Sequence, residues 1–227
     1  MKIMVISLGG SLIVPEKIDF NFLKKFRAEL RKHYKSWKFV VVCGGGSIAR
    51  KYISILKHDN KSLKQESLAG IRATRMNALL LMQLFGKEAN DTLPKDMKGI
   101  KSYLRKNKIV ICGALRFVAN STSDGTAARL AHFLKAEFIN MTNVKGLYTD
   151  NPKINPNAKF IPKETWKQFE ARALRRKYCA GQHFVLDQEA AVLIKTGKIP
   201  TYIINGNPKN ISKILNRQRF TGTLISG

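Results

Sequence analysis

Glycine-rich loops that follow apolar stretches are the residues of this sequence that first suggest chemistry. Two such loops lie in the first fifty residues, at positions 9–11 and 44–47, and a third, polar loop leads from Gly113 to Ser123. Glycine lets the backbone approach an anion closely, and a following helix offers free N–H groups and the positive end of its dipole. One such loop is more often a tight strand-to-helix turn, but two together favour phosphate binding.

The best-known phosphate-binding motifs do not occur in the chain. There is no GxxxxGK[ST] sequence, and neither glycine loop has the GxGxxG spacing of a dinucleotide site. The HRD and DFG sequences of protein kinases are also missing. A phosphate-handling enzyme with this sequence must therefore belong to another class.

Two charged residues near the loops are candidates for moving a phosphoryl group. Such a transfer depends mostly on positioning and charge neutralisation, which two helix N-termini, Mg²⁺ and Arg50 could provide. Arg50 has a simpler interpretation as a solvated charge on a helix. Asp124 could likewise be only the N-cap of the helix that contains Ala127 and Ala128.

The elements that must hold these residues follow from the pattern of apolar positions. Strands are expected at five short apolar runs, residues 2–8, 39–43, 109–113, 137–141 and 200–204. Amphipathic helices are expected between them, at residues 20–34, 47–56, 66–85, 124–135 and 187–196. This alternation predicts a three-layer α/β/α fold with a mostly parallel central sheet, in which ligands bind at the strand ends.

Two stretches fit this pattern less well. Residues 87–93 lie where another strand should be, yet they are polar. Residues 150–157 are rich in Asn and Pro and predict a loop that could divide two lobes of one sheet.

Composition limits the class of protein. The chain has 227 residues, 44% of them hydrophobic, which is enough for one large domain with a core and argues against a disordered or fibrous protein. Forty-one Lys and Arg residues against 15 Asp and Glu residues give a net charge of +26. This charge implies attraction to anions without distinguishing nucleic acid, a small phosphate or a membrane surface.

Cysteine usage and hydropathy predict the compartment. Three scattered cysteines, Cys43, Cys112 and Cys179, form no CxxC pair and are too few for a disulfide scaffold, so a reducing compartment is expected. No apolar run approaches the ~20 residues of a membrane span, and the first residues lack a signal-peptide cleavage pattern. The sequence therefore predicts a cytoplasmic protein with no membrane partner.

Longer blocks around the loops carry a more specific signal. Five blocks occur in the expected order: GGS at residues 9–11, GGG followed by ARKY within 44–52, GI with TRMNA within 70–78, SDGTAA at 123–128, and TNVKGLYT at 142–149. Together they resemble the amino-acid-kinase superfamily, and within it the archaeal type of uridylate (UMP) kinase. The resemblance runs from Met1 to Thr223.

The resemblance implies an amino-acid-kinase-like fold and a set of site residues. It implies one domain, residues 1–227, with an acceptor-binding lobe of about 1–140 and an ATP-binding lobe of about 141–227. It assigns ATP to Gly9, Gly10, Ser11, Gly45, Arg50, Thr142, Asn143, Tyr148 and Asn151. It assigns UMP to Gly44, Ser67, Asn120, Ser121, Thr122 and Ser123. Asp124 matches the aspartate that organises the catalytic groups at the transfer site, with Arg50 as the second catalytic residue.

The same resemblance implies the reaction and the assembly. The expected reaction is MgATP + UMP giving ADP + UDP, in pyrimidine nucleotide biosynthesis, with Mg²⁺ bound mainly through the nucleotide phosphates. A homohexamer is implied, built partly through the helix at residues 66–85. That helix carries more apolar residues than one buried stripe needs, which also predicts a second face in an interface: Leu79, Leu80, Leu81, Met82, Leu84 and Phe85.

Several positions depart from the family pattern. Ser7 stands where many members have a lysine, and Ser67 stands where an acidic residue is expected on the acceptor ribose. Asn151 and Lys145 replace aspartates, and the loop at residues 114–123 is about two residues longer than expected. Each change lies at a position where the family pattern expects a contact with a ligand. The sequence therefore predicts the acceptor less directly than it predicts the fold.

Two other functions remain open at this point. One is a kinase of the same superfamily that acts on another small phosphate or acid, such as isopentenyl phosphate, carbamate or an amino acid. The other is a non-catalytic relative that uses its charge to bind an oxyanion or nucleic acid. A nucleic-acid partner is not expected, because the basic residues are spread over 24–38, 172–177 and 209–219 without interleaved aromatic residues. The polar loop at 120–123 and Thr74 suit a pyrimidine and ribose better than an alkyl chain.

Overall fold

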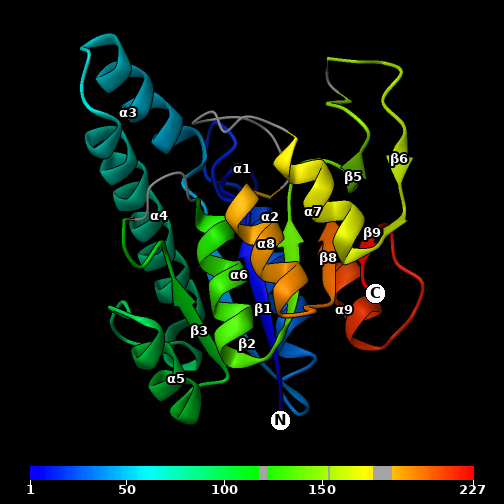
Figure 1. The fold of residues 1–227 in the computed structure, drawn as a ribbon. Helices are drawn as coiled ribbons and strands as arrows, with labels where there is room; N and C mark the ends of the chain where they lie inside the picture. The colour runs from blue at the N-terminus through cyan, green and yellow to red at the C-terminus, as the bar shows by residue number, and fades with distance from the viewer. Residues whose placement is uncertain (118–121, 153, 176–185) are drawn as a thin grey trace.

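A mostly parallel sheet of seven strands forms the centre of the molecule (Figure 1). The computed structural model describes residues 1–117, 122–152, 154–175 and 186–227. Neighbouring strands are parallel except for β8 and β9. In spatial order the strands are β3 (Ile109–Cys112), β2 (Trp37–Cys43), β1 (Lys2–Leu8), β4 (Glu137–Met141), β8 (Thr201–Ile204), β9 (Gly222–Ile225) and β7 (Lys163–Glu164).

Helices cover both faces of this sheet, which confirms the expected three-layer α/β/α fold. One face carries α1 (Gly10–Ile13), α2 (Phe20–Arg31), α4 (Leu63–Phe85) and α9 (Lys209–Leu215). The opposite face carries α5 (Met97–Lys106), α6 (Ser123–Leu134), α7 (Trp166–Leu174) and α8 (Gln188–Thr196). A further helix, α3 (Gly46–His58), packs against α4 beside the sheet (Figure 1).

Alternation along the strands builds the two cores. In β1, Met4, Ile6 and Leu8 join the core under α2 and α4, whereas Val5 joins the core under α6. Because side chains alternate along a strand, Ser7 lies on the same face as Val5. Burial on both faces explains why these strands are continuous apolar runs rather than alternating ones.

Near the carboxyl edge of the sheet, one row of residues under α6 departs from this apolar rule. The strand register places Cys112, Val42, Ser7, Asn140 and Ile203 side by side on β3, β2, β1, β4 and β8. All five are buried, and the third and fourth, Ser7 and Asn140, are polar. The centre of this row therefore brings two polar side chains below the start of α6.

The five expected strands and five expected helices are present, with boundaries that differ by at most three residues. Residues 87–93 do not form the strand that the alternation suggested, and a short 3₁₀ helix (Gly86–Glu88) begins the segment. The buried Asn90 explains the polar composition. Its side-chain amide accepts a hydrogen bond from the N–H of Ile111 at 2.7 Å and donates one to the carbonyl of Ile111 at 3.0 Å. The Asn90 side chain thus makes the hydrogen bonds to the backbone of β3 that a neighbouring strand would otherwise make.

Residues 150–157 connect the two strands of a hairpin outside the central sheet. The hairpin consists of β5 (Leu147–Tyr148) and β6 (Phe160–Ile161), which pair in antiparallel fashion. It rises beside the carboxyl edge of the sheet, near α7 (Figure 1). In the described part of the chain, no helix is both long and apolar enough to cross a membrane.

Candidate functional site

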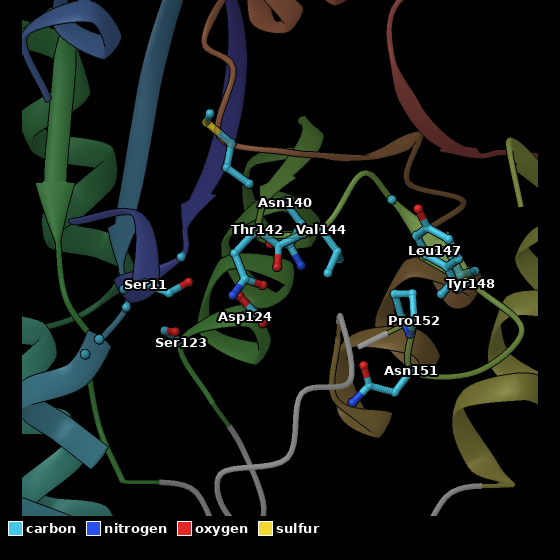
Figure 2. Close-up of a pocket in the computed structure, with 18 of the residues that line it drawn as sticks. Ser11, Ser123, Asp124, Asn140, Thr142, Val144, Leu147, Tyr148, Asn151 and Pro152 are labelled. Atoms are coloured by element: carbon cyan, nitrogen blue, oxygen red, sulfur yellow. The ribbon is translucent and has the colours of Figure 1, made fainter. Parts of the chain in front are cut away.

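A pocket opens at the carboxyl ends of β1, β2 and β4 (Figure 2). Its walls come from both glycine loops, the first turn of α6 and the segment that leads from β4 into the β5–β6 hairpin. Figure 2 shows Asp124, Asn140 and Thr142 on one side of this space and Tyr148 and Asn151 on the other. The pocket therefore lies where a parallel α/β sheet is expected to bind its ligands.

The two glycine loops touch each other at the base of the pocket. A Cβ atom on Gly10 would lie 2.0 Å from the backbone nitrogen of Gly46, which itself has a positive φ of 66°. Packing between the loops therefore requires these two glycines whether or not a ligand is bound. The tight-turn interpretation is right for them, and it does not exclude phosphate binding at the same place.

Helix starts supply the donors that an anion needs. After the loops, α1 begins at Gly10 and α3 at Gly46, and the N-cap of α3 is Gly45, which contributes no side-chain hydrogen bond. The N–H groups of a first helical turn have no carbonyl partner within their own helix. Gly10, Ser11 and Gly46 line a pocket that also contains the exposed cation Arg50. The N–H of Ser47 instead donates to the carbonyl of Val14 at 3.0 Å.

The opposite wall is suited to a nucleoside. Tyr148 packs edge-on against Phe160 across the hairpin, with ring centroids 5.5 Å apart, and Lys145 lies 4.5 Å from the same ring. The Thr223 hydroxyl accepts a hydrogen bond from the N–H of Leu147 at 2.8 Å, which ties the hairpin to β9. An aromatic ring and the polar side chain of Asn151 therefore border the pocket on this side.

Asp124 is the second residue of α6, and it is not the N-cap. Thr122 is the N-cap, and its hydroxyl accepts a hydrogen bond from the N–H of Asp124 at 3.1 Å. The Asp124 carboxylate instead lines the pocket and accepts a hydrogen bond of 2.5 Å from the Ser7 hydroxyl. The simpler interpretation of Asp124 as a helix cap is therefore wrong.

A second carboxylate holds the start of α6 in place. One oxygen of Asp187 accepts hydrogen bonds from the N–H and the hydroxyl of Thr122, at 2.9 and 2.8 Å. Its other oxygen accepts the N–H of Ala190 at 2.8 Å and caps α8. The sequence identifies Asp187 only as a helix start, because its second role joins positions 65 residues apart.

The pocket brings together most of the residues expected from the sequence. It includes Gly9, Gly10, Ser11, Gly44, Gly45, Arg50, Ser123, Asp124, Thr142, Asn143, Tyr148 and Asn151. Ser67 on α4 and Thr122 lie outside its described lining, so their acceptor roles stay predictions, and Asn120 and Ser121 lie outside the described residues. The expected site residues did not include eight further lining residues. Four of them lie within the glycine loop or the sequence block already singled out: Gly46, Val144, Gly146 and Leu147. The other four have little signal of their own: Asn140, Met141, Asp150 and Pro152.

Comparison with known proteins assigns the family. Residues 2–205 match the model of the amino acid kinase family. The chain belongs to the amino acid kinase family. A curated uridylate kinase of Thermococcus kodakarensis is 37% identical over 202 residues, which cover 88% of this chain and 89% of the relative. A uridylate kinase of Archaeoglobus fulgidus is 34% identical over the full length of both chains.

Solved structures agree with this family. The crystal structure of uridylate kinase from Archaeoglobus fulgidus matches this amino acid kinase over the whole of both chains, with a TM-score of 0.85 and 33% identity. The structure of UMP kinase from Ureaplasma parvum matches with a TM-score of 0.79 at 24% identity and supports the fold.

The electrostatics of the kinase pocket centre on Asp124. Burial raises the pKa of this carboxyl, the hydrogen bond from Ser7 lowers it, and the nearby charge of Asp187 adds a smaller rise, so that together they place the pKa at about 7. Without ligands the carboxyl is therefore close to half-protonated at neutral pH. Arg50 lines the same pocket, and a lysine is missing at Ser7, so no cation on β1 balances the aspartate.

The described residues of this amino acid kinase do not build a metal cage of their own. They contain no group of three or more His, Cys, Asp or Glu side chains that could hold an ion. The carboxylates of Asp124 and Asp150 line the pocket, and one or two carboxylates together with substrate phosphates are a donor set that suits Mg²⁺.

Proposed function

We propose that this chain is a UMP kinase, which transfers the γ-phosphoryl group of MgATP to UMP and gives ADP and UDP. The observation that carries the proposal is one pocket in which two glycine loops, Asp124 and the side chain of Tyr148 meet. Relatives named uridylate kinase that match along the whole chain support the same activity. The reaction is a step of pyrimidine nucleotide biosynthesis, and because both substrates are intracellular nucleotides we place the enzyme in the cytoplasm.

On the donor side, ATP would lie between the glycine loops and the hairpin. Its phosphates would accept hydrogen bonds from the N–H groups of Gly10 and Ser11 in the first turn of α1 and from that of Gly45, the N-cap of α3. Its adenosine would lie along Thr142 and Asn143 and beside the ring of Tyr148. These residues all line the same pocket, which supports an extended nucleotide there.

On the acceptor side, UMP would lie across Asp124 from ATP. Gly44 and Ser123 line the pocket, and Thr122 and Ser67 would complete the acceptor site together with the loop before α6. Ser67 provides no negative charge for the ribose. Beside it Glu66 is buried, and one of its carboxylate oxygens has no hydrogen-bond partner among the described residues.

The chain would act by positioning and by neutralising charge. Phosphoryl transfer spreads negative charge over the equatorial oxygens, and preorganised donors stabilise that charge in the transition state. The starts of α1 and α3 and the Arg50 guanidinium supply the donors. Asp124 would orient these groups between the two phosphates without forming a covalent bond. Magnesium, when bound with ATP, offsets the charge of the phosphates that the protein does not reach.

Exposed apolar side chains support the proposed homohexamer, although only one of the residues that the sequence suggested is among them. Of the six apolar residues at 79–85, five pack into or against the core of the same chain, and only Leu79 is exposed. Exposed apolar side chains also occur on α3 and on another turn of α4, as they do on other helices. We call Tyr52 and Ile55 of α3 together with Met76 and Leu79 of α4 the α3–α4 surface.

The proposed function is tested by identifying the product and by removing one charge. Purified protein with MgATP and UMP should form UDP and ADP in equal amounts. Asp124→Asn should lower kcat by roughly 10²–10³ with KM nearly unchanged, because the lost charge acts in the transition state. Unchanged kcat in a folded Asp124→Asn protein would contradict the assigned role of this residue, and absence of UDP with the wild-type protein would contradict the function.

A further inference from the structure

We propose that Ser7 is a positioning residue for phosphoryl transfer, whose hydroxyl fixes the orientation and the charge of the Asp124 carboxylate. The inference rests on the proposed function, because it assumes that Asp124 takes part in the transfer. It adds a residue on the central strand that contributes to the reaction without contacting either substrate. In the family pattern, Ser7 stands out only as a position where many members have a lysine.

The hydrogen bond between Ser7 and Asp124 is held by a strand inside the sheet. The Ser7 hydroxyl oxygen lies 2.5 Å from Oδ1 of Asp124, and Ser7 is fully buried. Ser7 lies on β1, which is paired along its length with β2 and β4, so its backbone is held from both sides. A donor on such a strand is better fixed than one on a loop. The hydrogen bond therefore constrains the Asp124 side chain at the pocket wall.

The buried position of Ser7 explains why its hydroxyl needs a partner. Its neighbour across β2 is the apolar Val42, and its neighbour across β4 is the buried Asn140. A buried hydroxyl without a hydrogen-bond partner costs free energy. The partner that satisfies this hydroxyl is the pocket carboxylate of Asp124.

Charge around Asp124 explains what the hydroxyl does. Asp187, before α8, adds a negative charge, Asn140 on β4 is neutral, and Asp150 on the hairpin lines the same pocket. Arg50 on α3 is the cation of this lining, and the start of α6 adds the positive end of its dipole. Among the causes that set the pKa of Asp124, burial and Asp187 raise it, whereas the Ser7 hydrogen bond lowers it. Loss of the hydroxyl should therefore favour the protonated, inactive carboxyl at neutral pH.

The test compares Ser7→Ala and Ser7→Thr with the wild-type enzyme. For each protein, kcat and KM for UMP are measured from about pH 5 to about pH 9. In Ser7→Ala the ascending limb of kcat should move up by about one pH unit, which is a roughly tenfold loss of kcat at pH values below the limb. KM should change little. Ser7→Thr keeps a hydroxyl and should return the limb toward the wild-type position.

A matched variant separates this effect from loss of packing. Val5→Ala removes buried atoms from the same face of the same strand, two positions before Ser7. It should lower stability without moving the pH limb. Titration of the Asp124 carboxyl by carbon-13 NMR in the ligand-free protein gives a readout that does not depend on turnover, and Ser7→Ala should shift this titration upward.

The outcomes are distinct. An unchanged Asp124 titration in folded Ser7→Ala would overturn the inference, and so would a loss of kcat that is equal at every pH. If the wild-type protein does not phosphorylate UMP, the proposed function fails by itself. The NMR titration then still decides whether Ser7 controls Asp124, since an upward shift supports that control and an unchanged titration contradicts it.

Discussion

At the scale of single residues, the site depends on a carboxylate that is costly to keep charged. Asp124 faces the pocket from the start of α6, and burial raises its pKa from 3.8 to about 7. The folded protein therefore holds a proton there at pH values where the unfolded chain has already released it. Folding stability consequently falls as the pH rises between these two values.

Asp124→Asn should therefore stabilise the protein above neutral pH. The substitution removes the charge that folding has to bury, while Thr122 continues to cap α6. At pH 8 the free energy of unfolding should rise by about 1–3 kcal/mol, and the gain should shrink to zero toward pH 3.8. Urea denaturation at both pH values measures the difference. Asp91→Asn, at an exposed aspartate outside the pocket, is the control, and an equal gain in both variants would contradict this account.

Sequence reasoning found Asp124 and missed the residues that control it. Asp124 lies in the block at 123–128, which the family resemblance makes visible. Its contact with Ser7 joins positions 117 residues apart, and the sequence marks Ser7 only by the absence of a lysine. Asn140 lies in an apolar strand and shows its place in the pocket only once β1 and β4 are in register. Local spacing cannot reveal contacts that depend on strand register.

At the scale of elements, the long apolar strands and the amphipathic helices between them were predictable. Each of the first strands is a continuous apolar run, because helices cover both faces, and β1 and β2 each end beside a glycine loop. The sequence interpretation missed α1, α5, α7 and α9 and the short strands β5, β6, β7 and β9. The strands have two to four residues, and α1 and α9 have four and seven, so their patterns are too short to separate from loops. In contrast, α5 and α7 are at least as long as α8, which was predicted, so their length does not explain why they were missed.

Loss of Asp187 should lower kcat as well as stability, unlike loss of an ordinary helix cap, because Asp187 links α6 and α8. Asp187→Ala removes the cap of α8 and both hydrogen bonds to Thr122. We expect a loss of about 1–3 kcal/mol in stability, together with at least a roughly tenfold loss of kcat, since the start of α6 carries Asp124.

The matched control is another aspartate cap outside the pocket. Asp96 caps α5 and accepts the N–H of Gly99 at 2.7 Å. Asp96→Ala should cost about 1 kcal/mol of stability and leave kcat of the folded enzyme unchanged. Denaturant unfolding and steady-state kinetics on both variants decide the point. Equal kinetic effects at the two caps would contradict a specific role for Asp187.

At the scale of the whole molecule, charge and the exposed apolar surface act in opposite directions on assembly. The net charge of +26 makes copies of the chain repel each other, whereas the α3–α4 surface offers apolar area to a partner copy. The sequence predicted that this part of the chain forms an interface. It could not identify the side chains, because Leu81, Met82 and Phe85 turn into the core of their own chain.

Light scattering at micromolar concentration should show a hexamer. The assembled fraction should be larger at moderate salt than at low salt, because salt screens the repulsion between the positively charged copies. Met76→Glu places a charge on the α3–α4 surface and should dissociate the assembly. Phe20→Glu, at an exposed apolar residue of α2, should not. A monomeric wild-type protein, or dissociation by both variants alike, would contradict the proposed interface.

The central claim is that the pocket at the carboxyl edge of the sheet phosphorylates UMP. The most direct measurement is ADP release from MgATP with UMP, CMP, dUMP and isopentenyl phosphate, each as the only acceptor. We predict the highest kcat/KM with UMP, because polar residues of the acceptor side suit a pyrimidine and a ribose better than an alkyl chain. Faster turnover of isopentenyl phosphate than of UMP in the same assay would contradict the account.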